Sequence, residues 1–172
     1  MMEVMRSSLS SWVDHRLLAI SLVDVFCILG AVLIISVSKY AGMWMYSLVA
    51  LPGTLAHELA HFVVALVLGA RPSFPSLVPI RTEHGWRLGS VTFRVGRLRA
   101  LPIALAPFVL LPLALWWAGS FLQSTSWPLY FLHVWVVAAL VTASLPSKAD
   151  FKLALPALIV AVVIALIVWM IW

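Results

Sequence analysis

The chain has 172 residues, of which 64% are hydrophobic and 10% charged, and its mean hydropathy is +1.10. Soluble domains carry about 25% charged residues, so this composition argues against a soluble globular protein and predicts a membrane protein. The net charge of +5 comes from 11 Lys and Arg spread along an apolar chain, a distribution typical of cytoplasmic loops and not of a nucleic-acid-binding surface. We therefore expect no nucleic-acid partner.

Cys27 is the single cysteine, which excludes an intrachain disulfide and leaves His, Asp and Glu as the residues that can hold a metal.

About five apolar runs approach the roughly 20 residues that a helix needs to cross a bilayer. They are Leu17–Val37, Met43–Ala70, Leu101–Leu122, Trp127–Leu145 and Leu153–Trp172. We therefore expect an all-α polytopic membrane protein, in which residues 1–172 form a single membrane-embedded domain.

A more polar segment, residues 76–95, separates the second run from the third. Its β-branched and aromatic residues fall in two stretches on either side of a short polar turn, a pattern that indicates a β-hairpin. In the second arm Val91, Phe93 and Val95 alternate with polar residues, so we expect their side chains to share one face.

Six of the eight arginines lie between Arg71 and Arg99, in and beside this hairpin. The positive-inside rule places the hairpin and the loop containing Lys148 in the cytoplasm, and the uncharged loop at residues 123–126 outside. We expect a multi-pass protein of a prokaryotic cell membrane, surrounded by the lipid bilayer, with a cytoplasmic N-terminus and an external C-terminus.

The second apolar run contains His57-Glu58-Leu59-Ala60-His61, the pattern H-E-x-x-H. On a helix, positions i and i+4 share a face about 6 Å apart, so both imidazoles can reach one tetrahedral zinc ion. Glu58 lies beside the pair, where a carboxylate can accept a proton from a water that zinc activates. A chance match to this pattern in such a chain is roughly 1 in 400. Ionisable residues within a span are costly and by default functional, which strengthens the prediction of a zinc site.

Two histidines and a water leave one protein ligand to be found. The candidates are Asp150 after the fourth run, Asp24 in the first run and His133 in the fourth. The motif lies about 15 Å from the cytoplasmic end of its helix, and a depth estimated in this way favours Asp24. Asp150 is alternatively an N-cap residue, Asp24 a buried polar partner and His133 a hydrogen-bonded packing residue.

From Met43 to Asp150 the chain resembles the site-2 protease family of intramembrane zinc metalloproteases. The resemblance rests on the membrane-embedded H-E-x-x-H, the basic hairpin after it, and an aspartate near the cytoplasmic end of a later span. It implies that His57, His61 and Asp150 hold Zn²⁺ and that Glu58 is the catalytic base. It also implies proteolysis within or near a transmembrane segment of another protein or peptide.

Two other functions remain open on the residues alone. A non-catalytic membrane protein can bind or transport a divalent metal through the same histidines, although it has no need of the base that Glu58 provides. The motif can also be accidental in a structural or assembly subunit. The sequence names neither the substrate nor the oligomeric state.

Overall fold

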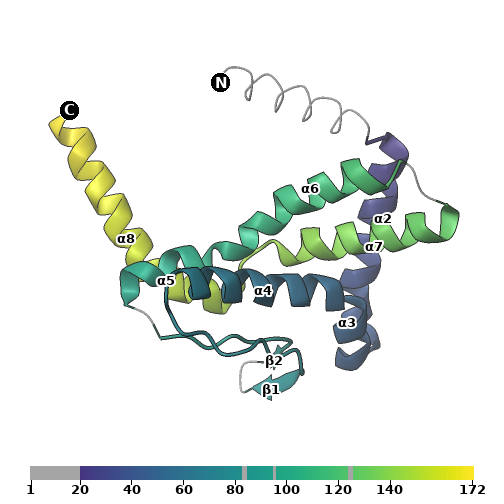
Figure 1. Ribbon diagram of the computed structural model, residues 1–172, viewed down its shortest axis with the longest axis horizontal. Helices are drawn as coiled ribbons and strands as arrows, with labels where there is room; N and C mark the ends of the chain where they lie inside the picture. Colours follow the sequence, from purple (N-terminus) through teal and green to yellow (C-terminus); the bar gives the residue numbers. More distant parts are fainter. Residues whose placement is uncertain (1–19, 83–84, 95, 124–125) are drawn as a thin grey trace. The chain divides into compact units, whose positions relative to one another are not determined.

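The computed structural model describes residues 20–82, 85–94, 96–123 and 126–172, and these residues are mostly helical (Figure 1). The helical class is therefore confirmed. Residues 17–19 of the expected first span, the hairpin residues 83–84 and Val95 lie outside the described residues. The chain forms two compact units. The first unit contains the described residues up to Gly53 together with Leu111–Thr142, and the second contains Thr54–Leu110 and Ala143–Trp172.

The first unit is helical. Its elements are α2 (Leu22–Ser38), the short 3-10 helix η1 (Lys39–Ala41), α3 (Met43–Val49), most of α6 (Leu110–Phe121) and most of α7 (Trp127–Ala143). Gly42 joins η1 to α3 with φ of 121°, a backbone conformation that residues with a Cβ atom rarely adopt. The chain can therefore turn directly from one helix into the next.

The break between α3 and α4 (Leu51–Val67) bends the second apolar run by 73°. Pro52 lacks an N–H group and cannot donate to the carbonyl of Leu48, so a continuous helix through this point loses a hydrogen bond. The indole N–H of Trp135 donates to the carbonyl of Val49, the last residue of α3, at 2.7 Å. A side chain from α7 thus satisfies a carbonyl at the end of α3.

The second unit holds most of α4 and the segments that surround it. The other elements are β1 (Ile80–Thr82), β2 (Gly85–Arg87), α5 (Arg97–Ala104), the 3-10 helix η2 (Ala106–Val109) and α8 (Lys148–Ile171). Helix α4 ends at Val67, and the φ of 67° at Gly69 allows the N–H of Ala70 to reach back to the carbonyl of Ala65 at 2.8 Å. Helix α5 packs against α8 (Figure 1).

The strands β1 and β2 pair antiparallel, with Ile80 opposite Arg87. The pairing continues toward α4 through a bridge between Ser76 and Ser90. The ring of Phe93 packs on a small core formed by Ala65, Ala70 and Ile103. The hairpin is therefore tied to the helices of its own unit.

The second arm of the hairpin alternates as its sequence predicts. Val91 and Phe93 are half-buried, whereas Thr92 and Arg94 are exposed. The shared apolar face is confirmed for these residues.

Within the described residues, Leu22–Ala41 is the one helix that is long and apolar enough to cross a membrane without a break. Two bent helix pairs reach this length if each is one span, Met43–Val49 with Leu51–Val67 and Trp127–Ala143 with Lys148–Val160, the latter bent by 46°. Ala106–Phe121 is apolar but shorter. The expected third run breaks at Leu105, and α8 begins at Lys148, before the expected start of the fifth.

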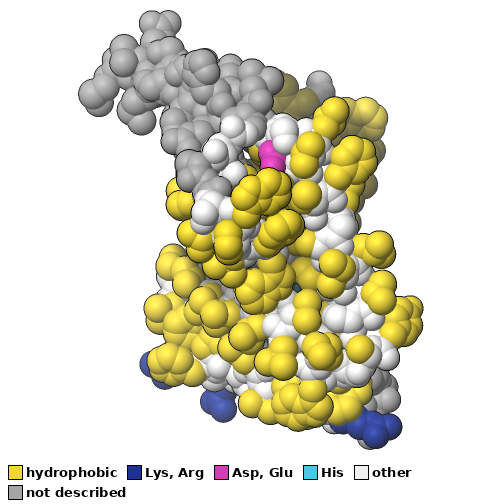
Figure 2. All heavy atoms as spheres, turned by 90° about the vertical axis from the view of Figure 1, so that its right-hand side faces the viewer, with side chains coloured by type: hydrophobic (Ala, Val, Ile, Leu, Met, Phe, Trp, Pro, Cys, Tyr) yellow, Lys and Arg dark blue, Asp and Glu magenta, His cyan; other side chains and the backbone are white. Residues whose placement is uncertain are grey.

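The surface is rich in exposed apolar side chains. On the face drawn in Figure 2, most side chains are hydrophobic. Trp44 in α3 and Phe26 in α2 are 67% and 71% exposed, and Val67 in α4 is 80% exposed. Such a surface is costly in water and suits a bilayer.

Trp135→Phe should lower the free energy of unfolding by about 1–2 kcal/mol, because it removes the donor to the Val49 carbonyl and keeps most of the ring's packing. Thermal unfolding in detergent measures the change. Trp116→Phe is the matched control, since Trp116 is 43% exposed and packs edge-on against the rings of Trp117 and Phe121. Equal stability losses in the two variants would show that the hydrogen bond contributes nothing.

Candidate metal centre

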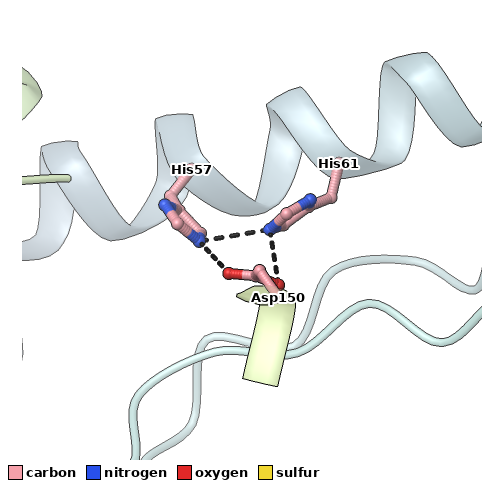
Figure 3. Close-up of side chains that lie close together, drawn as sticks. All are labelled: His57, His61 and Asp150. Atoms are coloured by element: carbon pink, nitrogen blue, oxygen red, sulfur yellow. Dashed lines mark hydrogen bonds and ion pairs between the residues drawn. The ribbon is translucent and has the colours of Figure 1, made fainter. Parts of the chain in front are cut away.

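Helix α4 places the two motif histidines one turn apart on the same face. Their Nε2 atoms approach each other to 3.2 Å, with the ring planes nearly perpendicular (Figure 3). His61 is buried and His57 is half-buried. The sequence prediction that both imidazoles can reach one ion agrees with this geometry.

Asp150, in the first turn of α8, faces both histidines. Its Oδ2 lies 3.5 Å from Nε2 of His57 and its Oδ1 lies 3.3 Å from Nε2 of His61 (Figure 3). The three residues form a group that could hold a metal ion, with one ligand atom from each within 4.8 Å of the others. The structure therefore brings together the three ligands that the resemblance implies.

Backbone carbonyls determine which ring nitrogen of each histidine carries the hydrogen. Nδ1 of His57 lies 2.8 Å from the carbonyl of Ala143, and Nδ1 of His61 lies 2.7 Å from the carbonyl of Ile103. Because a carbonyl only accepts, both Nδ1 atoms must donate, and in a neutral imidazole this leaves the Nε2 lone pair free. This arrangement is typical of metal-binding histidines.

The ends of two helices provide these carbonyls. Ala143 is the last residue of α7, and Ile103 lies in the last turn of α5. The carbonyls of a last turn lack N–H donors within their own helix. Pro107, four residues after Ile103, has no N–H group to offer it. The helix breaks thus leave acceptors available for the histidines.

Two lone pairs and a carboxylate that converge in this way repel one another unless a proton or a metal cation lies between them. Around a tetrahedral zinc ion with bonds of about 2.0–2.2 Å, neighbouring ligand atoms are roughly 3.3–3.6 Å apart. The two imidazole nitrogens are 3.2 Å apart, and Oδ2 and Oδ1 of Asp150 lie 3.5 and 3.3 Å from Nε2 of His57 and of His61 respectively. The donor set fits such an ion, and the spacing of the two imidazole nitrogens is close to that of neighbouring zinc ligands.

Asp150 also completes the N-terminal cap of α8. The backbone N–H of Ser147 donates to Oδ2 of Asp150 at 2.7 Å, and the N–H of Asp150 donates to Oγ of Ser147 at 3.3 Å. The N-cap residue is therefore Ser147, and Asp150, at the third position of the helix, both completes the cap and faces the histidines. The reciprocal bonds fix the orientation of the carboxylate.

Glu58 follows His57 on α4 and is 8% exposed. Its side chain lies against the backbone of Gly89, after β2. A carboxylate is thus buried in the second unit beside a histidine of the metal group, as the motif predicts.

Asp24 and His133, the other candidate ligands, have different partners in the first unit. Oδ1 of Asp24 accepts a hydrogen bond from the Tyr130 hydroxyl, and Oδ2 accepts from the Ser21 hydroxyl, both at 2.8 Å. The alternative reading of Asp24 as a buried polar partner therefore fits the structure. Sequence reasoning missed Tyr130, whose signal is a hydroxyl in a mostly apolar helix.

His133 packs among aromatic rings. The indole of Trp117 donates to its Nδ1 at 3.1 Å, and the ring of Phe121 stacks on it with centroids 5.3 Å apart. These contacts match the role of a hydrogen-bonded packing residue.

Comparison of the chain with family models, with curated proteins and with solved structures gives no significant match. The resemblance to the site-2 proteases therefore rests on the residues of the chain itself.

Ser147→Ala should weaken zinc binding by about tenfold, because it frees the N–H of Asp150 and loosens the carboxylate that faces both histidines. Titration of the purified protein with zinc against a competing chelator measures this. Ser21→Ala is the matched control, since Ser21 and Asp24 form the same reciprocal cap on α2. Both variants should lose stability by roughly 1 kcal/mol. Unchanged zinc affinity in Ser147→Ala would mean that the cap does not position the ligand.

Proposed function

We propose that the protein is an intramembrane zinc endopeptidase that hydrolyses peptide bonds in or near the transmembrane segments of other membrane proteins. The observation that carries the proposal is the convergence of the His57 and His61 Nε2 atoms with the Asp150 carboxylate. Glu58, next to this group on the same helix, is the proposed general base.

The donor set favours zinc among the common metals. Two neutral imidazoles and one carboxylate match catalytic zinc sites, which keep a fourth position for water or substrate. Magnesium and calcium prefer sites made of oxygen atoms alone. When bound, zinc polarises the substrate carbonyl and lowers the pKa of a bound water to about 7.

The buried carboxylate of Glu58 distinguishes a hydrolase from a protein that only stores or transports a metal. A metal carrier needs ligands, and His57, His61 and Asp150 provide them without Glu58. Hydrolysis also needs a group that takes a proton from the attacking water, and a carboxylate beside the paired histidines can do so. The position of Glu58 therefore favours an enzyme over a non-catalytic metal-binding protein.

A membrane location is supported by the apolar helix Leu22–Ala41 and by the exposed apolar side chains. We extend this to about five spans, with the arginine-rich hairpin in the cytoplasm, on the strength of the apolar runs and the charge distribution. The partners are then the lipid bilayer and a transmembrane protein or peptide as substrate. Because a helical substrate hides its carbonyls in its own hydrogen bonds, it must unwind locally before cleavage.

Glu58→Gln should abolish hydrolysis and leave zinc content unchanged, because it removes the proton acceptor and keeps every metal ligand. We expect a loss of about 10²–10⁴ in rate. The test is co-expression with a panel of single-span membrane proteins, followed by detection of cleavage products. Cleavage by the Glu58→Gln variant at the rate of the wild-type protein would remove Glu58 from the mechanism. If the wild-type protein binds zinc but cleaves no substrate, the non-catalytic alternative is favoured.

Asp150→Ala should lower zinc occupancy and hydrolysis together, whereas Asp24→Ala should affect stability and spare zinc. The reason is that Asp150 faces both histidines, while Asp24 bonds to Tyr130 and Ser21. Metal analysis of the two purified variants measures occupancy. Loss of zinc from Asp24→Ala with retention in Asp150→Ala would contradict this ligand set.

A further inference from the structure

Gly89 approaches the Glu58 side chain more closely than any residue with a Cβ atom can. A Cβ built on Gly89 would lie 2.6 Å from Oε1, 2.7 Å from Cγ and 2.9 Å from Cδ of Glu58. Backbone conformation does not explain the glycine, since its φ is outside the left-handed region. A Cβ on Gly30, Gly42, Gly69 or Gly96 would meet nothing within 4 Å. The close approach to Glu58 is thus specific to Gly89 among these five.

Backbone pairing holds Gly89 in place. The next residue, Ser90, exchanges two hydrogen bonds with Ser76, each 3.0 Å long. Two residues further on, the carbonyl of Thr92 accepts from the N–H of Ser73 at 2.8 Å, and the N–H of Thr92 donates to Oγ of Ser73 at 3.0 Å. The paired segment is in turn tied to the end of α4, because the N–H of Arg94 donates to the carbonyl of Ala70 at 3.1 Å.

The helix on the other side of the contact is equally constrained. His57 and His61 flank Glu58 on α4, and both are hydrogen-bonded to carbonyls of other helices. If a side chain is added at position 89, the Glu58 side chain is therefore the group that must move. Glu58 is 8% exposed, so any new position must be found inside the packed unit.

We propose that Gly89 is a positioning residue for the general base. Its missing side chain lets the extended segment lie directly on Glu58 and keep the carboxylate beside the metal group. This inference rests on the proposed function for its catalytic meaning, but the contact itself can be tested without catalysis.

The first test is a stability cycle in detergent that uses Gly89→Ala, Glu58→Ala and the double variant. Gly89→Ala should lower Tm by roughly 3–6 °C when Glu58 is present, and by clearly less when Glu58→Ala has made room for the added methyl group. Gly96→Ala is the matched control in the same connecting segment, and its effect should not depend on Glu58.

The second test is a kinetic cycle on a single-span protein that the wild type cleaves. Gly89→Ala should reduce kcat by about 10- to 100-fold with zinc content and KM within about twofold. Glu58→Asp shortens the base by one methylene and relieves the contact at Cγ and Cδ. The double variant should therefore be no slower than Glu58→Asp alone.

Coupling between positions 89 and 58 in either cycle supports the proposal. Additive effects in both cycles would overturn it, even if Glu58→Gln is inactive and the proposed function stands. If no substrate is cleaved, the proposed function fails, whereas coupling in the stability cycle would still establish the contact.

Discussion

Two imidazole nitrogens and a carboxylate face one point inside the second unit, and the rest of that unit is arranged around this convergence. Helix α4 supplies the histidines, α8 supplies Asp150, and the ends of α5 and α7 supply the carbonyls that orient the rings. Without a proton or a metal cation between them, the three groups repel one another in a poorly solvated interior. A metal ion bound by these groups would link α4 and α8, the two helices that carry the ligands.

The helix breaks are as important for the site as the helices. Pro107 has no N–H to donate to the Ile103 carbonyl, and this carbonyl, in the last turn of α5, lies 2.7 Å from Nδ1 of His61. The break after α7 has two effects, since it frees the Ala143 carbonyl for His57 and starts α8 so that Asp150 lies in its first turn. A negative side chain is favourable at that end of a helix.

The sequence predicts the helical class, the hairpin and the two histidines well, because these depend on composition, alternation and a fixed spacing of four residues. Depth along the helix favours Asp24 over Asp150, because such an estimate assumes straight helices, whereas the chain bends between Ala143 and Lys148 and places Asp150 beside the histidines. The carbonyl partners of the histidines were also beyond prediction, because every residue has a carbonyl and only the fold selects among them. The contact between Gly89 and Glu58 joins segments that are distant in the chain, and no local pattern indicates it.

The central claim is that His57, His61 and Asp150 bind one metal ion. X-ray absorption at the zinc edge of the purified, zinc-loaded protein tests it most directly. The account predicts one zinc per chain, with nitrogen and oxygen ligands at about 2.0–2.2 Å and the outer-shell scattering of two imidazoles. It also predicts that this imidazole signal is lost in the His57→Ala, His61→Ala double variant. Absence of stoichiometric zinc, or a spectrum that the double variant leaves unchanged, would contradict the account.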